Sequence, residues 1–203
     1  MNHTPVHPNC RSTRPNRAGG RGPSSFWMQA PDLIFDDLAI SPGERILDLG
    51  CGAGEYTLEA ARQAGPSSIV TALDHWPPIV EAMTQSARDE GLTWIRTIRA
   101  DITRPPLPVD SGSIDLCLLF TVLHIFDIER HGRPLFREIA RVLAPGGTLA
   151  VLECKKEDMP FGPPMHMRLS PGQVRAIAAD TGFRKTGRVD LAYNYLLRFV
   201  HQP

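Results

Sequence analysis

The sequence predicts an α/β domain built on a doubly wound, mostly parallel sheet with helices on both faces. Five apolar runs of strand length alternate with stretches of helical periodicity between residues 31 and 153. That alternation is typical of parallel strands joined by crossover helices. Two further β runs near the C-terminus lie so close together along the chain that an antiparallel pair is expected. The chain has 203 residues, which suits one domain.

The elements of the first three quarters follow from periodicity. An amphipathic helix over residues 31–39 precedes the sheet. The predicted strands are residues 45–49, 68–74, 94–100, 114–120 and 148–153. Helices are predicted over residues 55–64, over residues 77–90, and around residues 135–143. Pro145, Gly146 and Gly147 are expected to stop the last of these helices.

The last quarter of the chain has a different pattern. Residues 154–169 hold three prolines and three methionines without periodicity, so we predict a long loop that serves as a substrate lid. Ser170 and Gln173 form a capping-box pattern that starts a helix, and Gly182 is expected to end it. Residues 183–189 and 194–200 complete a sheet of seven strands.

The first 25 residues differ in composition from the rest. They contain four arginines and no acidic residue, with many prolines and glycines. Because this segment offers almost no apolar surface to bury, we predict a flexible basic tail. Residues 26–203 then form the single domain.

Composition narrows the class of protein. Twenty-two basic residues balance 22 acidic ones, which argues against a dedicated nucleic-acid binder. No apolar run approaches the roughly 20 residues that span a bilayer, and no signal peptide is recognisable, so a cytoplasmic location is expected. The four cysteines lie far apart without zinc-ligand spacing, so no metal site is predicted. The oligomeric state stays open, with a homodimer as one alternative.

A glycine-rich turn follows the first predicted strand, at Gly50, Gly52 and Gly54. Glycines let a backbone turn sharply and approach a ligand, and the next helix begins with unpaired N–H groups. The dinucleotide fingerprint requires glycine at position 55, where this chain has Glu55, so an NAD-dependent oxidoreductase is disfavoured. A phosphate-binding P-loop is also absent, because no Gly-Lys-Ser/Thr follows.

Carboxylates at the ends of the next two strands favour a ligand with a ribose and an adenine. Asp74 ends the second strand, where it can accept hydrogen bonds from ribose hydroxyls; helix capping is the alternative. Trp76 can cover one face of an adenine or belong to the core. Asp101 ends the third strand and can accept a hydrogen bond from an exocyclic amine.

Five ordered motifs carry a family resemblance over about residues 26–203. They are LDLGCGAG (47–54), ALDHW (72–76), RADITRPPLP (99–108), IDLCLLFTVLHIF (114–126) and REIARVLAPGGTLAVLE (137–153). With these motifs the sequence resembles the class I S-adenosylmethionine-dependent methyltransferases, and is similar to the ubiquinone/menaquinone-biosynthesis branch. The resemblance implies a Rossmann-like methyltransferase domain with strand order 3-2-1-4-5-7-6 and the last strand antiparallel. S-adenosylmethionine is the cofactor that it implies, with S-adenosylhomocysteine as product.

The resemblance also implies which residues hold this cofactor. The methionyl part would lie among Asp48 and the three glycines, with the carbonyl of Phe120 facing it, and Asp74 would hold the ribose. The full implied set is Asp48, Gly50, Gly52, Gly54, Asp74, His75, Trp76, Asp101, Ile102 and Phe120. Tyr56 either lies near the sulfonium or packs within its helix.

Methyl transfer needs orientation and sometimes a base, so the expected mechanism is direct, in-line and metal-independent. Polar candidates near the acceptor are His124, Glu153 and His166, with a packing role for His124 left open. Strand four lacks the Asn/Asp-Pro-Pro-aromatic signature of amino methylation, and no Pro-Cys follows a strand, so a small-molecule acceptor is expected. A regulatory module that binds the cofactor without turnover is the remaining alternative.

Overall fold

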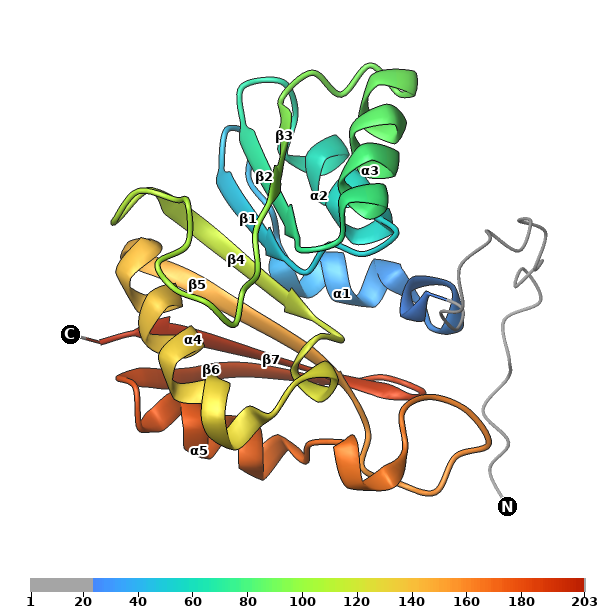
Figure 1. Cartoon of the computed structure of the whole chain (residues 1–203), viewed down its shortest axis with the longest axis vertical. Coiled ribbons are helices and arrows are strands. Elements are labelled where there is room, and N and C mark those ends of the chain that lie inside the picture. The colour runs from blue at the N-terminus through green and yellow to red at the C-terminus, as the bar shows by residue number, and fades with distance from the viewer. Residues whose placement is uncertain (1–23, 203) are drawn as a thin grey trace.

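A computed structural model of the chain describes residues 24–202. Its centre is one seven-stranded sheet of order β3-β2-β1-β4-β5-β7-β6 (Figure 1). The strands are β1 (Arg45–Leu49), β2 (Ile69–Asp74), β3 (Ile95–Arg99), β4 (Ile114–Phe120), β5 (Leu143–Cys154), β6 (Phe183–Asp190) and β7 (Asn194–His201). Strand β7 runs antiparallel to both of its neighbours, and the other pairs are parallel. The predicted fold class and strand order are confirmed.

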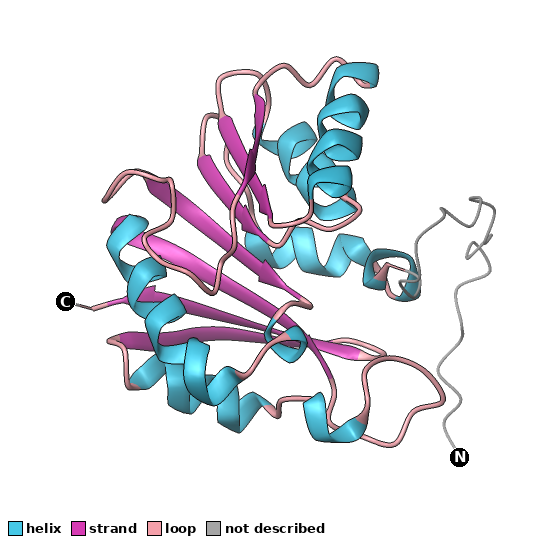
Figure 2. Ribbon diagram, in the orientation of Figure 1, coloured by secondary structure: helices cyan, strands magenta, loops and turns pink. Residues whose placement is uncertain are grey.

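Helices cover both faces of the sheet (Figure 2). The α-helices are α1 (Pro31–Leu38), α2 (Glu55–Ala64), α3 (Pro77–Asp89), α4 (Ile128–Val142) and α5 (Pro171–Ala179); single 3-10 turns are η1 (Ser25–Met28), η2 (Leu123–Ile125) and η3 (Met165–Met167). One apolar core joins the sheet to α4 and α5, and a second joins it to α1, α2 and α3. Alternating side chains of each strand feed these two cores, which explains the almost wholly apolar sequence of β4.

The boundary between α4 and β5 differs from the prediction. The helix ends at Val142, and Leu143 already pairs with Ile114 of β4. The pairing register shifts between Ile114 and Leu116, so the Pro-Gly-Gly segment is an irregular start of the strand and does not stop the helix directly. The predicted capping box is confirmed, because the Ser170 side chain accepts a hydrogen bond from the backbone of Gln173.

The N-terminal part of the domain is joined to strand β7 by one long-range ion pair. Residues 1–23 of the expected tail lie outside the described residues, whereas Ser25 already opens η1. Helix α1 is tied to β7 by an ion pair, with Arg198 Nε 2.7 Å from Asp37 Oδ2.

Within residues 24–202, none of the helices has the length and apolar character needed to cross a membrane.

Candidate cofactor and acceptor site

The turn from β1 into α2 has a backbone that only glycine adopts readily. Gly50, Gly52 and Gly54 have φ of 78°, 54° and 88°. A Cβ placed on Gly50 would lie 2.8 Å from Val122 Cγ2, and one on Gly54 would overlap the sulfur of Met83. The turn therefore lies tightly between α3 and the segment after β4, at the carboxyl edge of the sheet.

Asp48 lies buried beneath this turn, with 2% of its surface exposed. Thr57 Oγ1 donates a hydrogen bond of 2.5 Å to Asp48 Oδ2. Burial raises the pKa of Asp48 from 3.8 to about 6; the Thr57 bond lowers it, and the charge of Asp74 raises it further. The carboxylates of Asp48 and Asp74 interact electrostatically, and together they favour a cationic ligand.

The raised pKa predicts that Asp48 makes the protein less stable as pH rises. Between about pH 4 and pH 6 the unfolded chain loses the Asp48 proton while the folded chain keeps it, so the free energy of unfolding falls with increasing pH. The loss is complete above the folded pKa and amounts to about 3 kcal/mol. In Asp48→Asn this loss is expected to vanish, so the ligand-free variant should be more stable than the wild type at pH 7. Urea unfolding of both proteins from pH 4 to pH 7 measures the difference in the free energy of unfolding. Parallel plots of that free energy against pH would contradict the prediction. Asp89→Asn, at an exposed position, is the control.

Asp74 connects the end of β2 to the glycine turn and to α3. The N–H of Gly52 donates to Asp74 Oδ2 at 3.2 Å, and the N–H of Trp76 donates to Asp74 Oδ1 at 3.0 Å. His75 Nδ1 lies 3.6 Å from Asp74 Oδ1. Helix α3 has no side-chain cap, so Asp74 holds the turn before the helix and not its first N–H groups. A carboxylate has about four acceptor positions, so capacity for further donors remains.

A hollow of about 500 Å³ opens beside Asp74, lined by His75, Arg99, Ala100, Asp101 and Arg104. Asp101 Oδ1 accepts hydrogen bonds from the hydroxyl and the N–H of Thr103, and Arg104 Nε lies 3.2 Å from Asp101 Oδ2. The Thr103 hydroxyl, more than its N–H or the charge of Arg104, lowers the pKa of Asp101. Ile102 is buried and Trp76 is 38% exposed. The five residues predicted to hold the adenosine therefore lie at or just after the carboxyl ends of β2 and β3. They are Asp74, His75, Trp76, Asp101 and Ile102.

His124 and Glu153 form a pair at the ends of β4 and β5. Glu153 is fully buried; its Oε1 accepts the N–H groups of Val122 (2.9 Å) and Leu123 (2.7 Å). Its Oε2 lies 2.9 Å from Nδ1 of His124, whose side chain is 14% exposed. Because a carboxylate only accepts, Nδ1 is the nitrogen that donates in this pair, which leaves Nε2 as the ring nitrogen for a further partner. The predicted candidates His124 and Glu153 are therefore brought together, with Glu153 holding the imidazole rather than facing the acceptor itself.

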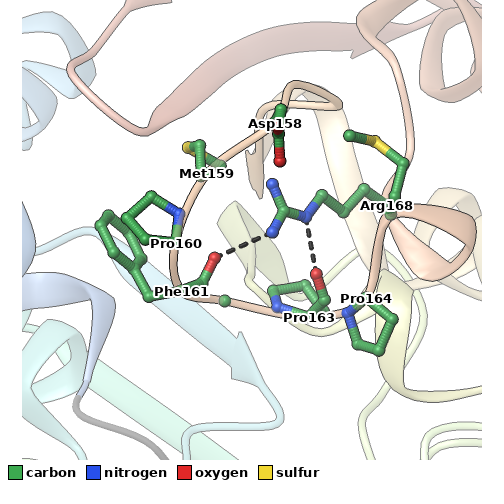
Figure 3. A pocket seen from close by; sticks show the side chains of 9 residues that line it. Asp158, Met159, Pro160, Phe161, Pro163, Pro164 and Arg168 are labelled. Atoms are coloured by element: carbon green, nitrogen blue, oxygen red, sulfur yellow. Dashed lines mark hydrogen bonds between the residues drawn. The ribbon is translucent and has the colours of Figure 1, made fainter.

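The loop predicted as a lid is organised by an arginine that the sequence reasoning missed. Arg168, 5% exposed, donates to the carbonyls of Pro163 (2.6 Å), Glu157 (2.6 Å) and Phe161 (2.8 Å). Figure 3 shows the loop curled around this guanidinium, beside a cavity of about 270 Å³. The third candidate, His166, is exposed in η3. An arginine just after a proline-rich stretch was the available signal, since prolines leave carbonyls without neighbouring N–H donors.

Lys155 and Lys156 lie at the start of the predicted lid loop, and both have partners within the fold. Lys155 Nζ lies 2.9 Å from Asp190 Oδ2, and Lys156 Nζ lies 3.5 Å from Gln173 Oε1.

Among the described residues, no group of three or more His, Cys, Asp or Glu side chains could hold a metal ion.

A second segment missed by the sequence reasoning lies against the start of α2. Phe26 of η1 is buried, with its ring centroid 5.1 Å from that of Tyr56. The Tyr56 ring meets that of Phe120 edge-on at 5.0 Å. The aromatic pair Phe26-Trp27, directly after the basic tail, was the signal for this contact.

Comparisons with known proteins agree with this geometry. Residues 47–151 match the family described as "Methyltransferase domain". The chain is 28% identical over 152 residues to a demethylmenaquinone methyltransferase of Lactobacillus johnsonii, covering 72% of this chain and 60% of that protein. It is 32% identical over 125 residues to a ubiquinone/menaquinone biosynthesis C-methyltransferase of Vibrio parahaemolyticus, covering 61% of this chain and 46% of that one. The chain thus spans about half of the length of these curated relatives.

A solved structure shares the fold. A SAM-dependent methyltransferase from Aquifex aeolicus superposes with a TM-score of 0.79 at 23% identity, covering 88% of this chain and 93% of that chain. The family match covers more than half of the chain and includes the glycine turn, Asp74, Asp101 and β4. The chain therefore belongs to the methyltransferase domain family, within the class I S-adenosylmethionine-dependent methyltransferases.

Proposed function

We propose that the protein transfers the methyl group of S-adenosylmethionine to a small-molecule acceptor bound at the carboxyl edge of the sheet. The observation that carries the proposal is the tight glycine turn over the buried carboxylates of Asp48 and Asp74. A sulfonium and an ammonium group suit this negative site, whereas the pyrophosphate of NAD would be repelled by Asp48, Asp74 and Glu55. When bound, the cofactor supplies an electrophilic methyl group.

The chain's own residues divide into holding and orienting roles. The backbone of the turn from Gly50 to Gly54 lies along the methionyl part, and Phe120 presents its carbonyl to the same group. Asp74 holds the ribose hydroxyls with its unused acceptor positions. His75, Trp76, Asp101 and Ile102 border the adenine beside the 500 Å³ hollow.

His124 is the proposed general base for an acceptor that must lose a proton. Its Nδ1–H is held by Glu153, so Nε2 is the atom that accepts the proton from the acceptor. Glu153 is a positioning residue, because its buried carboxylate contacts His124 and two backbone N–H groups. The 154–169 lid excludes water above the pair, and His166 in that lid is a proposed acceptor contact.

Calorimetric titration with S-adenosylmethionine, S-adenosylhomocysteine and NADH tests the cofactor assignment. Micromolar binding of the first two and none of NADH is expected. Tight binding of NADH alone would overturn the proposal. A screen of small-molecule acceptors with labelled S-adenosylmethionine then separates an enzyme from a regulatory module, since a module binds the cofactor but labels no acceptor.

Replacing Asp74 with Ala is expected to weaken S-adenosylhomocysteine binding by about 1–3 kcal/mol, because two hydroxyl hydrogen bonds to the ribose are lost. Calorimetry gives the affinity, and thermal unfolding checks that the glycine turn survives the loss of its Asp74 contact. Asp89→Ala, at an exposed position on α3, is the matched control. If Asp74→Ala binds S-adenosylhomocysteine with wild-type affinity, Asp74 does not hold the ribose.

A further inference from the structure

We propose that residues 24–29 form a roof over the methionyl end of the cofactor site, and that the Tyr56 hydroxyl fastens this roof and slows release of the cofactor. The inference rests on the proposed function, because the ligand beneath the roof is the cofactor proposed above. Figure 1 shows η1 and α1 at the end of the sheet toward which β4 and β5 point. We call residues 24–29 the N-terminal roof.

Three polar contacts join the roof to the first turn of α2. The hydroxyls of Ser25 and Tyr56 lie 3.1 Å apart, and Gln29 Nε2 donates to the Tyr56 hydroxyl at 2.8 Å. Trp27 Nε1 donates to Glu55 Oε1 at 3.3 Å. Glu55 and Tyr56 directly follow Gly54, so these contacts reach one rim of the proposed methionyl site.

A fourth contact reaches the opposite rim, at the end of β4. Ser25 Oγ lies 3.5 Å from Thr121 Oγ1, and Thr121 directly follows Phe120. Thr121 has φ of 53°, which is rare for a β-branched residue and typical of functional sites. Its N–H donates to the carbonyl of Leu152 at 2.6 Å, so β5 holds it in this conformation. The roof is therefore joined both to the first turn of α2 and to the end of β4, the two segments that border the proposed methionyl site.

Buried groups of the roof and of Tyr56 favour a closed state over an open one. Phe26 and Tyr56 are 8% and 7% exposed and pack ring against ring. Gln29 Oε1 is buried and has no hydrogen-bond partner within residues 24–202. The ammonium group of a methionyl moiety is a donor of the kind that this acceptor lacks.

The Tyr56 contacts are expected to affect the dissociation rate of the cofactor more than its association rate. A cofactor bound beneath the roof leaves only after the Tyr56 contacts break, so weakening them lowers the barrier to dissociation. Tyr56→Phe removes both hydroxyl contacts but keeps the ring that packs on Phe26 and Phe120. Gln29→Ala removes one of the same contacts from the other side.

Surface plasmon resonance with S-adenosylhomocysteine on the full-length protein tests the roof. Dissociation is expected to be about five- to tenfold faster in Tyr56→Phe and in Gln29→Ala than in the wild type. The effects of the two changes should be less than additive in the double variant, because both remove the Gln29–Tyr56 contact; any further gain in rate over Tyr56→Phe comes from the lost Gln29 Oε1 acceptor. Gln63→Ala is the matched control, since exposed Gln63 makes a comparable bond to Glu59 on α2 away from the turn.

The outcomes separate the inference from the proposed function. If the wild type does not bind S-adenosylhomocysteine, the cofactor assignment fails and the roof fails with it. If the wild type binds but the variants dissociate at its rate, the roof inference alone is overturned. Lower melting temperatures with unchanged dissociation would mean a purely structural contact and would also overturn it. Hydrogen exchange of residues 24–30 should slow on ligand addition in the wild type and much less in Tyr56→Phe.

Discussion

Replacing Glu153 with Gln is expected to keep the fold and to lower the methyl-transfer rate by about 10²- to 10⁴-fold. The amide oxygen of a glutamine can still accept the N–H groups of Val122 and Leu123. Its NH₂ group would then face Nδ1 of His124, which must accept instead of donate. The imidazole proton moves to Nε2, so the nitrogen that faces the acceptor can no longer take a proton.

Two measurements check this expectation. Nitrogen-15 NMR of the imidazole should show the Nδ1–H form of His124 in the wild type and the Nε2–H form in Glu153→Gln. Single-turnover transfer to an acceptor found in the screen should show the rate loss with unchanged cofactor affinity. Glu138→Gln is the matched control, because Glu138 is also buried and accepts the N–H of Leu107, far along α4 from the acceptor edge. A wild-type rate in Glu153→Gln would assign His124 to packing.

Replacing Arg168 with Lys is expected to loosen the predicted lid loop, residues 154–169, while leaving the sheet folded. A lysine keeps the charge, but its single ammonium cannot reach three carbonyls that surround a planar guanidinium. Each hydrogen bond from a charged group contributes about 1.5–3 kcal/mol, so the local stability of the loop should fall by about 3 kcal/mol or more. Amide exchange of residues 157–168 would then be accelerated by about 100-fold or more.

Hydrogen-exchange mass spectrometry of the lid peptides measures this effect. Arg133→Lys is the control, since Arg133 pairs with Asp180 on an exposed surface and its replacement should leave the lid unchanged. If Arg168→Lys exchanges at the wild-type rate, the fork geometry of Arg168 does not order the loop and the prediction is wrong. Other contacts, such as the ring packing of Phe161 on Tyr193, would then order it.

The parts of the fold predicted correctly are those that local pattern determines. Apolar runs and helical periodicity located all seven strands, and the spacing of the last two predicted their antiparallel pairing. The order of the strands came from the family resemblance, because periodicity does not reveal which strands are neighbours. The end of α4 was placed too late, since pairing of Leu143 with β4 overrides the helical pattern that continues up to Pro145.

The residues of the candidate site were likewise predictable only where the local sequence determines their position. Residues next to glycine turns or strand ends, such as Asp74 and His124, could be selected because sequence position brings them to one edge. Gln29 and Arg168 were missed, because their partners are Tyr56 and main-chain carbonyls that only tertiary structure brings near; for Arg168 the proline-rich stretch before it was a weak signal. Glu153 was selected for its strand end, but its role in holding His124 depends on a turn after β4 that the sequence does not specify.

The ion pair between Asp37 and Arg198 links residues 161 positions apart. It joins the helix that follows the roof to the last strand of the sheet. During synthesis, residue 37 emerges from the ribosome long before residue 198, so this ion pair cannot form until nearly the whole chain exists. The polar fastening of α1 to β7 is therefore expected to be among the last contacts made. A chain truncated before β7 would keep the packing of Phe35 beside Tyr56 but would lose this ion pair.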